Sequence, residues 1–339
     1  SRILWNYLLV YLLIGAGLWF TIRTRFVQVR LFPQMIRTMS SSREGSEGGI
    51  SSFQAFAVGL ASRVGTGNIA GVAIALTLGG PGAVFWMWVV GLIGMATGFV
   101  EATLAQLYKV RWDDGSFRGG PAYYIQTGLK SRAGGVVFAV LLIFTFGVAF
   151  NMVQANTISD VLKNAHTINP TWTAVVLAAL TTPVVFGGVR RIAKVSELVL
   201  PFFALVYVAL AVVIVLMNLT AVPGVFADIF SSAFGLNPAL AGTAGGITAA
   251  MLNGAKRGLF SNEAGMGSAP NAAATATVDH PVKQGLIQSL GVFVDTIIIC
   301  SSTARRPAVS TMTTLRLFSL AKAIPFLAMA IGSVLPGSE

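Results

Sequence analysis

Charged residues are scarce in this chain of 339 residues: Asp, Glu, Lys and Arg make up only 10% of it, whereas hydrophobic residues make up 55%. A soluble domain carries about 25% charged residues. This composition, with a mean hydropathy of +0.76, therefore excludes an ordinary soluble protein. A helix needs about 20 apolar residues to cross a bilayer, which leaves room for about eight or nine crossings. We expect an all-α polytopic membrane protein embedded in the lipid bilayer.

The chain also lacks the residues from which metal centres and many active sites are built. It has one cysteine, Cys300, and two histidines, His166 and His280, which are far apart in the sequence. A single cysteine excludes an internal disulfide and a cysteine-rich metal site. No pairing of Ser with His within a span, no HExxH pair and no phosphate-binding loop is present. The sequence therefore predicts neither an enzyme nor a bound cofactor.

The net charge of +11 predicts membrane topology rather than nucleic-acid binding, because the basic residues gather in particular loops. They follow the first, third and fifth predicted spans, at residues 23–43, 109–132 and 190–194. Loops rich in Lys and Arg stay on the cytoplasmic side of a membrane. We therefore expect a multi-pass protein of the cell membrane with its N-terminus outside.

A polar, glycine-rich stretch from Gly59 to Val72 interrupts an apolar segment that runs from Phe53 to Leu78. Unpaired backbone groups are costly in hydrocarbon, so a helix breaks there only beside a cavity that holds something polar. A second half-helix starting near Thr66 would direct free N–H groups at a carboxylate, and the carbonyl groups of the first half suit a small cation. The alternative is a glycine-rich kink at which helices pack closely.

A second interrupted segment occupies residues 241–276, with its break predicted from Asn253 to Ser268. The two interrupted segments are the second and seventh spans, so they lie five spans apart in opposite orientation. Inverted five-span repeats that each open on a broken helix are typical of secondary transporters. The alternatives are coincidence between two glycine-rich helices and, for Lys256, Arg257 and Glu263, a cytoplasmic loop.

Five motifs in order resemble the alanine/glycine:cation symporter family. They are Gly65-Thr66-Gly67-Asn68-Ile69, Gly79-Gly80-Pro81-Gly82-Ala83-Val84-Phe85-Trp86-Met87-Trp88, Phe117-Arg118-Gly119-Gly120-Pro121-Ala122-Tyr123-Tyr124, Asn151-Met152-Val153-Gln154-Ala155-Asn156 and Arg257-Gly258-Leu259-Phe260-Ser261-Asn262-Glu263-Ala264-Gly265. The resemblance implies a leucine-transporter-like fold of two inverted five-helix repeats preceded by one extra N-terminal helix. It also implies uptake of L-alanine or glycine coupled to Na⁺ or, less often, to H⁺.

The resemblance also implies roles for individual residues. The substrate-binding residues would be Gly65, Thr66, Gly67, Asn68, Gln154, Asn253, Gly254 and Phe260. Na⁺ prefers oxygen ligands, which the backbone carbonyl groups from Ala61 to Val64 and the hydroxyl group of Ser62 would supply. Arg257 and Glu263 would be gating or structural charges. For Gln154 the alternative is a polar contact that holds two helices together.

The resemblance ends near Ser302, and the segment 303–339 carries basic residues on the side that should be outside. We expect a truncated or frameshifted tail and a second repeat that is incomplete at its C-terminus. The predicted division is an N-terminal helix (1–22), a cytoplasmic basic loop (23–50), the first repeat (51–217), an extracellular interfacial segment (218–240), the start of the second repeat (241–302) and the tail (303–339).

The predicted function is Na⁺-coupled import of a small neutral amino acid by alternating access. Two alternatives remain open at this point. The chain would be a non-transporting remnant if its tail abolishes coupling, or a channel if its polar residues lined a continuous pore. A saturable flux would separate a transporter from a channel.

Overall fold

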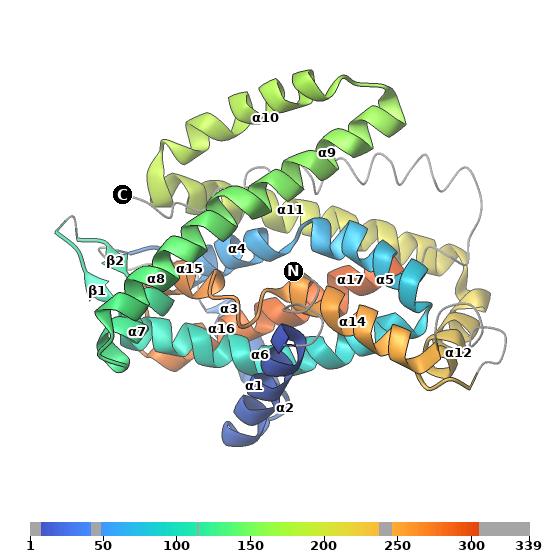
Figure 1. The fold of residues 1–339 in the computed structure, drawn as a ribbon, viewed down its shortest axis with the longest axis horizontal. Coiled ribbons are helices and arrows are strands. Elements are labelled where there is room, and N and C mark those ends of the chain that lie inside the picture. The colour runs from blue at the N-terminus through green and yellow to red at the C-terminus, as the bar shows by residue number, and fades with distance from the viewer. Residues whose placement is uncertain (1–7, 42–48, 114, 237–245, 305–339) are drawn as a thin grey trace.

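The computed structural model describes residues 8–41, 49–113, 115–236 and 246–304, and most of these residues are helical (Figure 1). The elements before residue 130 are α1 (Val10–Arg23), α2 (Val27–Arg30), α3 (Phe32–Ser40), α4 (Ser52–Arg63), the π-helix η2 (Gly67–Gly71), α5 (Val72–Gly79), α6 (Gly82–Leu107), β1 (Val110–Arg111), β2 (Phe117–Arg118) and α7 (Pro121–Gly128). Strands β1 and β2 pair antiparallel and are a small departure from the expected all-α fold.

The later elements are also helical. They are α8 (Arg132–Leu142), the π-helix η3 (Ile143–Phe150), α9 (Asn151–His166), α10 (Pro170–Val185), α11 (Gly188–Met217), the 3₁₀ turn η4 (Leu219–Ala221), α12 (Val222–Ala233), α14 (Gly246–Asn262), α15 (Ala269–Thr275), α16 (Pro281–Phe293), the π-helix η5 (Val294–Ile299) and α17 (Cys300–Ala304). The predicted tail lies outside the described residues except for its first two positions.

Four continuous helices in the described part of the chain are long and apolar enough to cross a membrane: residues 82–107, 132–164, 188–217 and 281–304. Shorter apolar helices cover residues 10–23, 67–79, 170–185 and 219–233. A membrane protein satisfies its backbone hydrogen bonds within such helices. The chain is therefore a mostly helical membrane protein, as its composition predicts.

Helices α14, α15 and α16 pack against α6, and α1 crosses below it in the view of Figure 1. Small residues allow close approach of the backbones. A Cβ added to Gly254 of α14 would lie 2.3 Å from the carbonyl oxygen of Ala83, and one added to Gly258 would lie 3.3 Å from the Cα of Met87. Gly254 and Gly258 therefore set the distance between α14 and α6.

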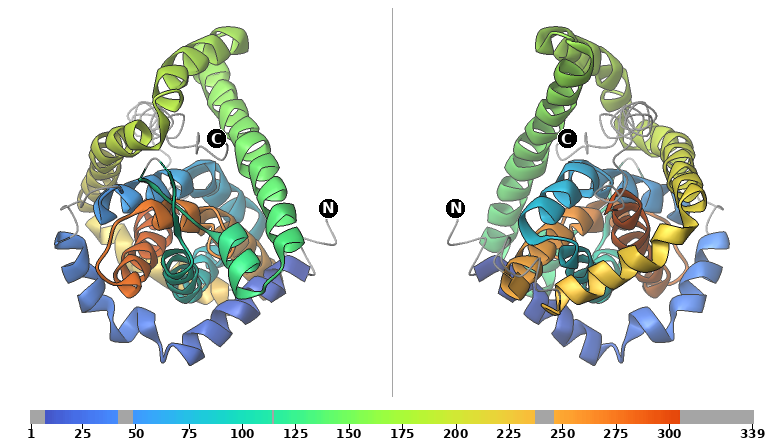
Figure 2. Two further views of the ribbon diagram at one scale, coloured as in Figure 1. Left: turned by 90° about the vertical axis from the view of Figure 1, so that its left-hand side faces the viewer. Right: turned by 90° about the vertical axis from the view of Figure 1, so that its right-hand side faces the viewer.

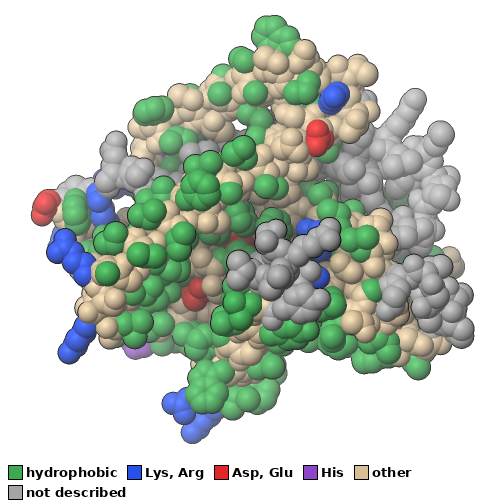
Figure 3. Space-filling view, viewed as in Figure 1, with side chains coloured by type: hydrophobic (Ala, Val, Ile, Leu, Met, Phe, Trp, Pro, Cys, Tyr) green, Lys and Arg blue, Asp and Glu red, His purple; other side chains and the backbone are tan. Residues whose placement is uncertain are grey.

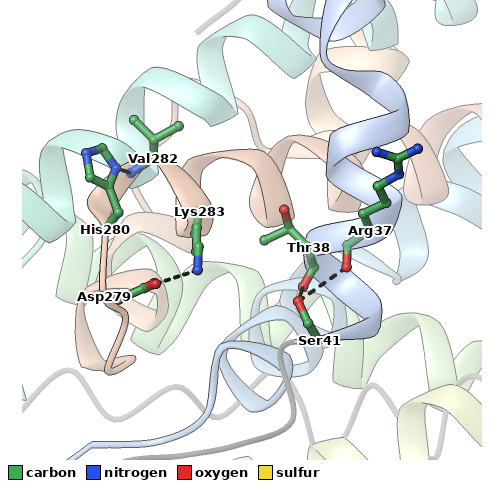
Figure 4. Close-up of polar contacts among 7 residues, drawn as sticks. All are labelled: Arg37, Thr38, Ser41, Asp279, His280, Val282 and Lys283. Atoms are coloured by element: carbon green, nitrogen blue, oxygen red, sulfur yellow. Dashed lines mark hydrogen bonds and ion pairs between the residues drawn. The ribbon is translucent and has the colours of Figure 1, made fainter.

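The segment 23–50, expected as a basic loop, contains helices α2 and α3. Met35 is fully buried in a cluster with residues of α6 and α16, and Phe32 and Met39 of α3 pack against the same cluster. The end of α3, with Arg37, Thr38 and Ser41, lies beside the start of α16, where Lys283 pairs with Asp279 (Figure 4). The ammonium group of Lys283 lowers the pKa of the exposed Asp279 carboxyl group.

Helices α9, α10 and α11 form an arch that rises away from the central helices (Figure 2). The third basic cluster, Arg190, Arg191 and Lys194, was expected in a loop but lies in the first turns of α11. Arg and Lys have good helix propensity, and the helix simply extends beyond its apolar part. Hydrophobic side chains cover the outer face of α8 and α9, and basic side chains gather near β1 and below α1 (Figure 3).

The residue before α4 pairs with the residue after α15. Ile50 N donates to the Thr275 carbonyl oxygen at 3.2 Å, and Thr277 N donates to the Ile50 carbonyl oxygen at 3.0 Å, which makes an isolated parallel β-bridge to Ala276. Lys109 Nζ donates to the Ala276 carbonyl oxygen at 2.7 Å. Partial burial lowers the pKa of Lys109 to about 8.

Candidate functional site

The first predicted break is present between α4 and η2. Ser51 and Gln54 form a capping box at the start of α4, and the helix ends at Arg63. Val64 has extended backbone angles, and the chain becomes helical again at Thr66, which precedes η2. The next residues continue as a π-helix into α5, so the break carries the N-terminus of a second half-helix as expected.

The side-chain oxygens of Asn68 and Gln154 accept hydrogen bonds from backbone N–H groups of this break. Gly65 N donates to Asn68 Oδ1 at 2.7 Å, and Thr66 N donates to Gln154 Oε1 at 3.1 Å. Gln154 is buried and comes from α9, 88 residues away in the chain. The hydroxyl group of Thr66 is buried and has no hydrogen-bond partner among the described residues. The structure therefore brings Gly65, Thr66, Asn68 and Gln154 together.

Asp295 is the acceptor at the centre of this region. It is fully buried in η5, and its Oδ1 accepts from Asn68 Nδ2 at 2.7 Å while its Oδ2 accepts from Ser261 Oγ at 2.9 Å. Thr296 donates to the same Oδ2 at 3.1 Å. One carboxylate thus connects the first broken helix to the last turn of α14.

The second break is shorter than expected and starts later. We predicted it from Asn253, but α14 continues without interruption to Asn262, and the break covers only residues 263–268. Glu263 has φ 52°, and Gly265 and Gly267 have φ 89° and 82°. These left-handed conformations end α14, because they cannot continue a right-handed helix.

Asn253 and Gly254 consequently do not line a break. Asn253 Nδ2 donates to the carbonyl oxygen of Ala249 within α14 at 2.9 Å, and Gly254 packs against α6. Phe260 does reach the first break, since a Cβ added to Gly67 would lie 3.3 Å from its ring. That ring stacks on Phe150 with centroids 5.3 Å apart.

Glu263 and Ser62, predicted in separate roles, contact each other. Glu263 Oε2 accepts from Ser62 Oγ at 2.8 Å and from Ser268 Oγ at 2.5 Å. Ser62, Ala61 and Val64, the predicted Na⁺ ligands, lie at the C-terminus of α4, where carbonyl groups lack partners within the helix. Arg257, the other predicted charge, lies farther back in α14, with its Cδ 3.8 Å from a Cβ added to Gly71.

Arg63 brings a positive charge among several carboxylates. It is 3% exposed, and its Nη1 donates to the Gln288 carbonyl oxygen at 3.4 Å. Its guanidinium group interacts electrostatically with Asp295, Glu263 and Glu101. If all four groups are ionised, the carboxylates outnumber the guanidinium group, so the cluster attracts a further cation.

Sequence reasoning missed Asp295, Arg63 and Glu101. Each is an ionisable residue inside a predicted span, and such residues are functional candidates in a membrane protein. That signal is present in the sequence, although neither Asp295 nor Glu101 lies in one of the five family motifs.

Comparison with known proteins decides the family. The model of the sodium:alanine symporter family matches residues 1–337. The chain belongs to that family. Members of this family are transporters rather than enzymes, which agrees with the absence of a catalytic motif.

Three relatives are similar to this member of the sodium:alanine symporter family. The amino-acid carrier protein AlsT of Bacillus subtilis is 57% identical over 304 residues, which are 90% of this chain and 64% of AlsT. The probable sodium/glutamine symporter GlnT of the same organism is 52% identical over 90% of this chain and 63% of GlnT. The sodium/alanine symporter AgcS of Methanococcus maripaludis is 42% identical over 89% and 68%. The chain thus spans about two thirds of the length of these relatives.

Proposed function

We propose that this protein imports a small neutral amino acid, alanine or glycine, across the cell membrane together with Na⁺. Transport would proceed by alternating access about the two breaks, within a leucine-transporter-like fold of inverted repeats whose N-terminus lies outside. Membership of the sodium:alanine symporter family and the names of AlsT and AgcS support a cation-coupled amino-acid transporter.

One observation carries the proposal: the buried carboxylate of Asp295 joins the first break, through Asn68, to the last turn of α14, through Ser261. A buried carboxylate surrounded by amide and hydroxyl groups is the kind of oxygen cluster that binds a small hard cation. Because the cluster contacts both broken helices, a cation bound there would hold them in one relative position.

The substrate carboxylate would bind at the N-terminus of the second half-helix. Its positive dipole end favours an anion, and the unpartnered hydroxyl group of Thr66 is available to donate. Gln154 now accepts from Thr66 N. A bound carboxylate would replace the Gln154 oxygen and free its amide group to contact the substrate.

The stacked rings of Phe260 and Phe150 favour a small substrate over a large one. The Phe260 ring lies against Gly67, so a side chain leaving the carboxylate site in that direction meets an aromatic wall. A hydrophobic wall excludes one additional methylene group only weakly but a longer polar side chain more strongly. We therefore favour alanine or glycine over glutamine, the substrate in the name of GlnT.

The test is uptake of labelled alanine into proteoliposomes, with and without an inward Na⁺ gradient. We expect saturable uptake that requires Na⁺ and is lost in a Thr66→Ala/Gln154→Ala variant. Uptake driven equally well by a proton gradient would indicate H⁺ as the coupling ion.

Two results would contradict the proposal. A flux that rises linearly with alanine concentration would indicate a channel. A well-inserted protein without uptake under any gradient would indicate a chain that does not transport by itself.

A further inference from the structure

The carboxylate of Glu263 connects the end of α4 to the second break. Glu263 is 3% exposed and is the first residue of the second break. One oxygen, Oε2, accepts both from Ser62 in the last turn of α4 and from Ser268 directly before α15. A buried carboxylate that accepts two hydroxyl groups makes strong, charge-assisted hydrogen bonds.

The rest of the second break is fixed to a different helix. Gly265 N donates to Glu101 Oε2 of α6 at 2.9 Å, and Asn262 Oδ1 accepts from Ala264 N at 3.0 Å. Neither of these bonds includes α4. The second break would therefore keep its shape on α6 if the end of α4 moved away. Such a movement must break the bond between Ser62 and Glu263, which joins the end of α4 to the second break, and also the bond from Arg63 to the Gln288 carbonyl oxygen of α16.

Charge adds to the same contact. Arg63 follows Ser62 in the chain and interacts electrostatically with Glu263 and with Asp295. A movement of the end of α4 would therefore separate a buried cation from two carboxylates as well as break a hydrogen bond. Separation of buried charges is costly in a medium of low dielectric constant, so the closed arrangement is the stable one until another interaction compensates.

We propose that Glu263 is a latch residue: its hydrogen bond to Ser62 holds the end of α4 against the second break and closes one side of the binding site. The bond breaks when α4 moves to open that side. In the proposed transport cycle, breaking this contact is the opening step. That role rests on the proposed function, whereas the contact itself does not.

The chain contains its own reporter of the opening. Cys300 is the single cysteine, and it is 2% exposed, with its Sγ 3.4 Å from Asn68 Nδ2 and 3.2 Å from Ser261 Oγ. A thiol reagent can reach it only when the site opens. The rate of Cys300 modification in sealed vesicles, with a membrane-impermeant reagent on one side at a time, therefore measures opening toward that side.

The experiment compares Ser62→Ala and Glu263→Gln with the unaltered protein. We expect Cys300 to react about tenfold faster in both variants, from one side of the membrane only, because each variant weakens a charge-assisted hydrogen bond. Ser62→Thr keeps the hydroxyl group and should restore the slow rate. Ser40→Ala is the matched control, since among the described residues Ser40 Oγ donates only to the Arg37 carbonyl oxygen of its own helix.

Several results would overturn the latch. These are unchanged Cys300 rates in variants that keep the melting temperature of the unaltered protein, an equal increase from both sides of the membrane, or a Ser62→Thr variant as fast as Ser62→Ala. If Glu263→Gln does not fold, Ser62→Ala decides alone. Alanine uptake is measured separately, so a protein that fails to transport but shows one-sided acceleration supports the latch and contradicts only the proposed function.

Discussion

At the scale of single residues, Asp295 is the group on which cation coupling should depend. Asp295→Asn keeps the shape and most hydrogen bonds of the side chain but removes its charge. We expect the Na⁺ concentration for half-maximal alanine uptake to rise about tenfold or more, because a neutral amide attracts a cation far less than a carboxylate does. Asp279→Asn, the same change at an exposed position before α16, should leave it unchanged. Equal Na⁺ dependence in both variants would exclude Asp295 as a cation ligand.

Phe260 is the residue on which substrate size should depend. Phe260→Ala removes the ring that lies against Gly67 and stacks on Phe150. We expect unlabelled glutamine to become a competitor of alanine uptake, and the half-saturating alanine concentration to rise about tenfold. Phe202→Ala, on the exposed face of α11, is the matched control. If glutamine competes no better after Phe260→Ala than after Phe202→Ala, the aromatic wall does not select the substrate.

Lys109 predicts a dependence of stability on pH. Its pKa is lowered to about 8 by burial, whereas in the unfolded chain it is about 10.4. Between these values the unfolded state binds the additional proton, so stability rises with pH from about 8 to about 10. Lys109→Met should remove that part of the rise in melting temperature, measured in detergent. If the melting temperature of Lys109→Met rises with pH as much as that of the unaltered protein, Lys109 does not cause the rise.

At the scale of elements, the contact between α14 and α6 depends on glycine, and Gly254 approaches α6 more closely than Gly258 does. Gly254→Ala places a methyl group 2.3 Å from the Ala83 carbonyl oxygen, and such overpacking costs about 1–3 kcal/mol. We expect a clear decrease in melting temperature. Gly15→Ala adds a methyl group to α1 with nothing within 4 Å of it, and it should be neutral or slightly stabilising. A similar effect of both changes would indicate that helix propensity rather than packing decides.

The two breaks show what the sequence can and cannot predict about elements. The first break was predicted correctly, because Gly65 and Gly67 stand beside the polar residues Thr66 and Asn68, a combination that is costly inside a continuous membrane helix. The second break was predicted too early in the sequence. Gly254 and Gly258 lie inside the continuous helix α14, where they allow close packing against α6 and do not break the helix. A glycine that allows close approach and a glycine that ends a helix look the same in a sequence, and only the neighbouring helix distinguishes them.

The residues of the site divide in a similar way. Gln154 could be assigned to the first break from its motif, and its bond to Thr66 N agrees with that placement. Asp295 could not be assigned, because its partners Asn68 and Ser261 lie 227 and 34 residues away. The pairing of Ser62 with Glu263 crosses 201 residues. Such contacts depend on the packing of helices, which local patterns do not contain.

At the scale of the whole molecule, the distribution of basic residues predicts orientation. A cysteine at Arg111 in strand β1 should lie in the cytoplasm, and one at Thr220 after α11 should lie outside. In a Cys300→Ser background, an impermeant maleimide should label Thr220→Cys in intact cells and Arg111→Cys only after permeabilisation. The reverse pattern would place the N-terminus in the cytoplasm.

The β-bridge at Ile50 gives α4 a pivot. Two backbone hydrogen bonds fix the chain to the end of α15 directly before α4 begins, and the other end of the helix is held by the side chain of Ser62. The 12 residues of α4 span about 18 Å. A rotation of roughly 10° about Ile50 would therefore displace Ser62 by about 3 Å, enough to break its hydrogen bond. A small angular change at Ile50 thus becomes a displacement of Ser62 that is large enough to release Glu263.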